Sequence, residues 1–140
     1  MAKENSKLMA NQREIVFSSA LRAAGAHTSN IITNHCAKGG VFYLDITAET
    51  GTSTLDVKLQ VLDPIGGDWV DLGDDVAGTG AYAIPQADAV TTGPTIMTIY
   101  PGLTVEAGKV CNGILPMQFR AHATVGGTNM TFSLAVDLIA

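Results

Sequence analysis

Hydrophobic and polar residues alternate along much of the chain, with the two-residue period of a β-strand that has one buried face. Between residues 55 and 61 the odd positions are hydrophobic, and Asp56, Lys58 and Gln60 stand between them. Residues 115–125 and 130–138 repeat the pattern over longer runs. The turn sequence VGGTN at residues 125–129 separates these runs, so we expect them to form an antiparallel hairpin.

Further strands are predicted between turn-rich joints. Residues 42–46 alternate in the same way, and residues 94–100 (PTIMTIY) predict a further strand that the turn Pro101-Gly102 closes. Residues 68–72 (DWVDL) predict a short strand after the turn at residues 63–67. Residues 14–24 suit a strand or a helix, and we favour the strand because its neighbours need a pairing partner. A total of about seven or eight strands predicts an all-β fold, either an antiparallel β-sandwich or a closed barrel.

Two segments interrupt this pattern. Residues 1–12 have no apolar period, which predicts a flexible, extended N-terminal arm before a single β-sandwich domain at residues 13–140. Residues 73–93 are rich in Gly, Ala and Asp and alternate weakly. We expect a long loop there, holding one short strand around residues 82–84.

The composition narrows the possible partners. The chain has 140 residues and a formal net charge of −5, and its four cations and two glutamates within residues 1–26 leave the remaining body acidic. An acidic body lacks the basic stripe that nucleic-acid binding requires. No apolar run reaches the ~18 residues of a membrane span, and the run between Glu14 and Arg22 is too short for a signal peptide. We therefore expect neither nucleic acid nor membrane as a partner.

Residues that could carry chemistry are few. The acidic residues at 68–75 do not follow the EF-hand pattern and are interpreted as a solvated loop. No phosphate-binding glycine loop is present, and the aromatic residues are too few for a sugar cleft. We expect both cysteines to be reduced, buried thiols, and predict a protein that is not an enzyme and has no metal or cofactor. The soft metal ligands have no zinc spacing: His27, His35, Cys36, Cys111 and His122.

Three segments of the chain resemble small virion proteins of tailed bacteriophages. They are LDVKLQVLDPIGGDWVDL (55–72), TIYPGLTVEAG (98–108) and ILPMQFRAHATVGGTNMTFSLAVDLI (114–139). The shared pattern is a Q-x-x-D-P-x-x-G-x-W/Y-x-D-L strand–turn–strand, a Y-P-G-L turn and a terminal L-P-x-x-(W/F)-R-x-x-x-x-x-G-G hairpin. Phe119 stands where Trp is common, and the polar leader also departs from the pattern.

The resemblance implies a capsid decoration, or cement, protein with a β-sandwich or jelly-roll fold. Such proteins bind the outside of an icosahedral head near its three-fold positions as homotrimers. The expected partners are therefore the major capsid protein and further copies of this chain, and the expected location is the virion surface after assembly in the host cytoplasm. We expect the arm and residues 13–24 to reach neighbouring subunits. The candidate interface residues are Arg13, Ile15, Phe17, Trp69, Tyr100, Pro101 and Leu103.

Other functions could use the same fold. A carbohydrate-binding or host-attachment module would expose Trp69, Tyr82 or Tyr100 as platforms for sugars, whereas a decoration protein would bury them. A tail or neck protein would use the same sheets elsewhere in the virion. A small enzyme would need Cys36 or Cys111 as a reactive thiol.

Overall fold

The computed structural model describes residues 12–50, 52–72, 84–88, 92–106 and 109–140. Within these ranges the chain forms nine β-strands and no helix, which confirms the all-β prediction. The strands are β1 (Arg13–Thr28), β2 (Ile32–Thr33), β3 (Gly39–Glu49), β4 (Thr54–Leu62), β5 (Trp69–Asp71), β6 (Ile84–Asp88), β7 (Gly93–Ile99), β8 (Val110–Cys111) and β9 (Gln118–Ile139).

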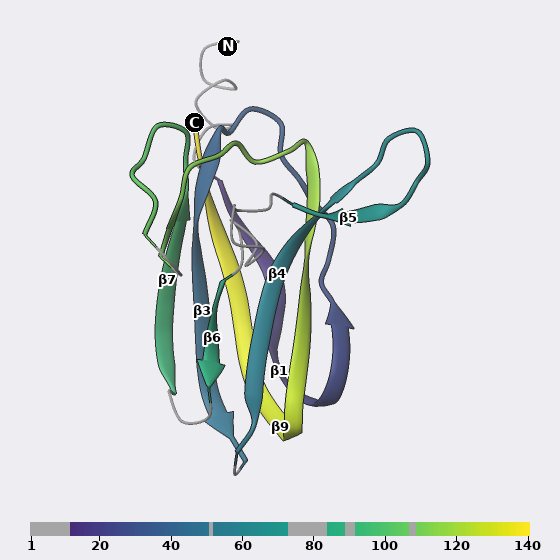
Figure 1. Cartoon of the computed structure of the whole chain (residues 1–140), viewed down its shortest axis with the longest axis vertical. Coiled ribbons are helices and arrows are strands. Elements are labelled where there is room, and N and C mark those ends of the chain that lie inside the picture. Colours follow the sequence, from purple (N-terminus) through teal and green to yellow (C-terminus); the bar gives the residue numbers. More distant parts are fainter. Residues whose placement is uncertain (1–11, 51, 73–83, 89–91, 107–108) are drawn as a thin grey trace.

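A bent ribbon of two strands forms the corner of the fold (Figure 1). β1 pairs antiparallel with β9, and both strands bend at residues 23–25 and 125–129. Gly127 lies in this bend with a φ of 86°, a conformation that favours glycine, and a Cβ there would meet the Cα of Ser53 at 2.9 Å. A residue with a side chain would therefore strain the corner.

The expected hairpin at the C-terminus is wrong. The VGGTN sequence does turn the chain, but the two halves of β9 cannot pair with each other because both of their edges are occupied. The first half lies between β1 and β4, and the second half lies between β1 and β3. The corner therefore carries one continuous strand from one layer of the fold into the other.

The nine strands form one curled sheet, a half-barrel, whose two halves face each other (Figure 1). We call the half that contains β8, β7, β3, residues 130–139 of β9 and residues 13–23 of β1 the first layer. The second layer contains β5, β6, β4, residues 118–126 of β9, residues 25–28 of β1 and β2. All of these pairings are antiparallel except that of β7 with β8.

The core lies between the layers. β9 supplies its odd-numbered residues from 119 to 125 and its even-numbered residues from 130 to 138, all of them buried. The change from odd to even at the corner keeps both sets on the inner side as the strand changes layer. The rings of Phe42 in β3 and Phe119 in β9 meet edge to face across the layers, with centroids 6.1 Å apart. Phe17 packs edge to face on Phe132 within the first layer, with ring centroids 5.4 Å apart.

The structure confirms two further predicted strands. Residues 14–24 form a strand, as favoured, and residues 68–72 contain β5. Most of the short strand expected around residues 82–84 lies outside the described residues. Ile84, the last residue of that range, is the first residue of β6. The N-terminal arm also lies outside them, apart from Gln12. Cys111 is buried as expected, but the prediction for Cys36 is wrong, because this residue lies exposed between β2 and β3.

Candidate interaction surfaces

The outer face of the first layer carries a row of apolar side chains across four strands. Ile15 of β1 lies opposite Ala135 of β9, Ala135 lies opposite Tyr43 of β3, and Tyr43 lies opposite Ile96 of β7. We call these four residues the apolar row. Ile15 is 61% exposed and Ile96 is 52% exposed, while the other two are half-buried. Because side chains directly opposite in a sheet lie close together, the row forms one continuous strip.

Arg13 and Asp137 form an ion pair along one side of the apolar row. Arg13 donates two hydrogen bonds to Asp137, from Nε to Oδ1 at 2.6 Å and from Nη2 to Oδ2 at 2.9 Å. These bonds lower the pKa of Asp137. A hydrogen bond to Asp137 raises the pKa of Tyr43, whose ring centroid lies 6.0 Å from the Arg13 guanidinium. The row is therefore bordered by a neutralised pair on this side, and by Asp45 of β3, opposite Ser133 and Pro94, on the other side.

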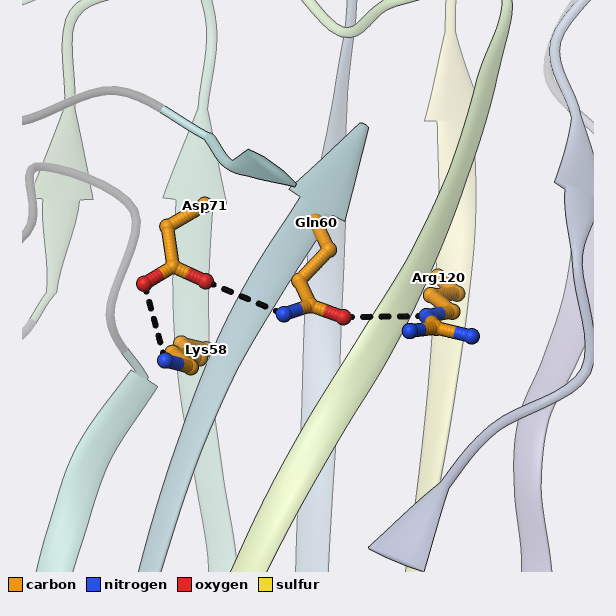
Figure 2. A network of polar contacts seen from close by, with 4 residues as sticks. All are labelled: Lys58, Gln60, Asp71 and Arg120. Carbon is orange, nitrogen blue, oxygen red and sulfur yellow. Dashed lines mark hydrogen bonds and ion pairs between the residues drawn. The ribbon is translucent and has the colours of Figure 1, made fainter. Parts of the chain in front are cut away.

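The outer face of the second layer carries a chain of polar contacts instead (Figure 2). Lys58 Nζ donates to Asp71 Oδ2 at 2.8 Å, and Gln60 Nε2 donates to Asp71 Oδ1 at 3.0 Å. Arg120 Nε donates to Gln60 Oε1 at 2.9 Å. The hydrogen bond from Lys58, with that from Gln60, lowers the pKa of Asp71. Because an ionised carboxylate only accepts, Asp71 fixes which end of the Gln60 amide faces Arg120.

Trp69 is tied to the same network. The Arg120 guanidinium lies 4.3 Å from the centroid of the Trp69 ring, a cation–π contact between β9 and β5. This contact covers one face of the ring that a stacked sugar would need. Tyr100 is half-buried, and its hydroxyl donates to the Ala140 carbonyl at 2.9 Å. Tyr82, the third platform considered, lies outside the described residues.

The candidate interface residues do not gather on one surface. Arg13 and Ile15 lie on the outer face of the first layer, whereas Trp69 belongs to the second. Phe17 lies in the core, only 4% exposed, so its ring is not available to another molecule. The turn at residues 101–103 follows β7, with Pro101 half-buried and Leu103 partly exposed.

Several residues of these surfaces were missed from the sequence. Tyr43 stands at an outward position of an alternating run, which is a usable signal, whereas residues 94–100 do not alternate and give no such signal for Ile96. What joins them to Ala135 is the strand register, which alternation alone does not reveal. Arg120 was likewise visible as an outward position of β9, but its contact with Trp69 depends on the order of β5, β4 and β9 in the sheet.

No group of three His, Cys, Asp or Glu side chains that could hold a metal occurs among the described residues. Asp71 of the acidic cluster is occupied by Lys58 and Gln60, and Asp74 and Asp75 lie outside the described ranges. The described part of the chain contains no helix that is long and apolar enough to cross a membrane.

Comparison with known proteins gives one distant likeness. No protein-family model matches the chain, and no curated protein matches it. A chain from a structure of infectious bursal disease virus, Gt strain, aligns with 91% of this chain at 12% sequence identity and a TM-score of 0.44. The aligned region spans 32% of the viral chain, about a third of its length. A likeness at this level assigns neither a family nor a function.

Proposed function

We propose that the chain is a structural protein of a tailed-bacteriophage virion, a capsid decoration protein that binds the outside of the assembled icosahedral head. The three sequence segments that resemble such proteins support this proposal, and they coincide with β4 to β5, the turn after β7, and β9. The major capsid protein is the partner. Following the resemblance, the bound form is a homotrimer at three-fold positions.

The observation that carries the proposal is the outer face of the first layer. Two large isoleucines stand more than half exposed on it, in one strip with Tyr43 and Ala135. Arg13 and Asp137 on one side of the strip satisfy each other, whereas Asp45, at the next outward position of β3 on the other side, has no ion pair among the described residues. A partner that covers this face would therefore have to supply a cation or a hydrogen-bond donor for Asp45. A continuous, exposed apolar strip with polar residues beside it is typical of a protein contact surface.

Binding alone accounts for a stabilising role. A ligand that binds the assembled shell and not its dissociated subunits shifts the equilibrium toward the shell by mass action. Many copies on one head add their separate contributions. No step in this mechanism needs a catalytic group, and the strip on the first layer supplies the contact.

Co-sedimentation with purified mature heads tests the proposal. The full chain should sediment with heads, reach saturation at a fixed number of copies per head, and raise the temperature at which the heads release their DNA. Sedimentation equilibrium of the free chain measures its oligomeric state separately. Binding to purified tails but not to heads would contradict the proposal and favour a tail protein, and binding to neither would exclude both.

A further inference from the structure

A loop between β4 and β5 projects from the body of the fold (Figure 1). It consists of residues 63–68, and we call it the projecting loop. Ile65 lies in it with 95% of its side chain exposed, more than any other exposed large hydrophobic residue described. An aliphatic side chain that is fully exposed to water does not stabilise the free protein, because only burial of its surface is favourable.

The projecting loop is held in one conformation. The backbone N–H of Asp63 donates to the Asp68 carbonyl at 2.8 Å, and the N–H of Gly67 donates to the Asp63 carbonyl at 2.9 Å. The N–H of Ile65 donates to Asp63 Oδ1 at 2.9 Å. Pro64 restricts the backbone beside Ile65, and Gly67 has a φ of 79° that suits glycine. Ile65 is therefore presented by a fixed turn.

The network in Figure 2 anchors the base of the projecting loop. β5 has only three residues at the edge of the sheet, a length that would fray on its own. Asp71 ties it to Lys58 and Gln60 of β4, and Trp69 ties it to Arg120 of β9. A segment fixed at its base and within its turn loses little further freedom when it binds, so its contacts count almost fully toward affinity.

The charge around Ile65 indicates the kind of partner. Asp63 and Asp68 flank it in the turn, and Asp68 is exposed. The chain as a whole carries a net charge of −5, so a second copy would mostly present like charge to this loop. Electrostatic complementarity favours a basic surface on a different protein.

We propose that the projecting loop inserts Ile65 into an apolar pocket with a cationic rim on the major capsid protein. The proposal rests on the proposed function, which supplies the shell as partner. It adds a contact separate from the apolar row. The loop extends beyond the two layers, so it reaches a part of the shell that the face of the first layer does not cover.

Binding of full-length variants to purified mature heads tests this. Ile65→Ala should weaken binding by about tenfold or more, which is the effect of losing one buried aliphatic side chain. Ile114→Ala removes an isoleucine that is 62% exposed outside the loop and serves as the matched control, with no expected change. Pro64→Gly keeps Ile65 but loosens the turn, so it should weaken binding less than Ile65→Ala. Asp68→Asn should weaken binding and reduce its dependence on salt.

The outcomes separate this inference from the proposed function. If the wild-type chain binds heads and Ile65→Ala binds equally well, the loop proposal is overturned and the proposed function stands. If Ile65→Ala lowers self-association in sedimentation but leaves head binding unchanged, the occupant is a second copy, and the proposal is again overturned. If the wild-type chain does not bind heads, the proposed function itself fails. Unfolding curves of each variant confirm that the fold is intact.

Discussion

The outer faces of the two layers differ sharply, although one continuous strand, β9, contributes to both. On the first layer the outward residues of β9 and its neighbours form the apolar row, with two isoleucines more than half exposed. On the second layer the corresponding positions hold Lys58, Gln60 and Arg120, joined through Asp71 in a hydrogen-bonded chain. The buried inner positions of β9 are apolar in both layers.

This difference separates the part of the hydrophobic pattern that folding requires from the part that folding leaves free. Folding requires the inner residues to be apolar, and both layers meet that requirement. It places no such demand on the outer residues, and a face that only meets water can be polar, as the second layer is. The apolar face of the first layer is the one whose composition folding does not explain, so it is the better candidate for a binding surface.

The largest expected effect tests whether the two unlike layers share one core. Phe119→Ala removes the ring that meets Phe42 across the layers and should lower the free energy of unfolding by about 3–5 kcal/mol. Urea unfolding followed by Trp69 fluorescence measures it. Thr124→Ala, an exposed position on the same strand, should change the free energy by less than about 0.5 kcal/mol. Equal effects of the two changes would show that the layers are not packed together as described.

The second-largest expected effect is a loss of head binding when a charge is placed on the outer face of the first layer. Ile96→Asp places a charge in the apolar row and should weaken head binding by about tenfold or more, because an apolar contact is lost and a charge is desolvated. Thr28→Asp puts the same charge on the outer face of the second layer and should leave binding unchanged. Titration of heads with each variant measures both. Weaker binding by Thr28→Asp alone would assign the contact to the second layer.

A smaller effect sharpens the role of the polar network. Arg120→Gln removes the contact over Trp69 and the hydrogen bond to Gln60, which should cost about 1 kcal/mol. Losing these contacts should loosen β5, so amide hydrogen exchange should be faster in that strand. Arg13→Gln cuts the ion pair on the first layer and should leave exchange in β5 unaltered. Unchanged exchange in β5 after Arg120→Gln would mean that the network does not hold this strand.

The smallest effect is a pH dependence. The pKa of Asp71 is lowered in the folded chain below the value of 3.8 that it has when free. Its contribution to stability is therefore present above pH 4 and is lost as the pH falls through the folded pKa. Because the pair is exposed, Asp71→Asn should cost only about 0.2–1 kcal/mol at pH 7, and the cost should shrink as the pH falls through the folded pKa. Asp56→Asn, at another outer position of β4, is the matched control, and a difference between Asp71→Asn and wild type that stays constant as the pH falls below 4 would contradict the account.

Only part of the fold can be predicted from the pattern of apolar and polar residues. Alternation placed the inner faces of β3, β4 and β9 correctly because burial follows directly from the two-residue period. The corner at Gly127 was misread because VGGTN is equally compatible with a hairpin, and only the occupied edges of β9 distinguish the two. Arg120 and Trp69 are far apart in the sequence and meet through the strand order, which local pattern does not encode. Cys36 was expected in the core from its residue type alone, whereas its position in a joint between strands exposes it.

Oxidative footprinting of the full chain, free and bound to mature heads, tests the central claim most directly. It compares Tyr43 and Ile96 on the outer face of the first layer with His122 on that of the second. Bound protein should show strong protection of Tyr43 and Ile96 and unchanged oxidation of His122. Protection of His122 with Tyr43 and Ile96 still reactive would show that the first layer does not face the shell.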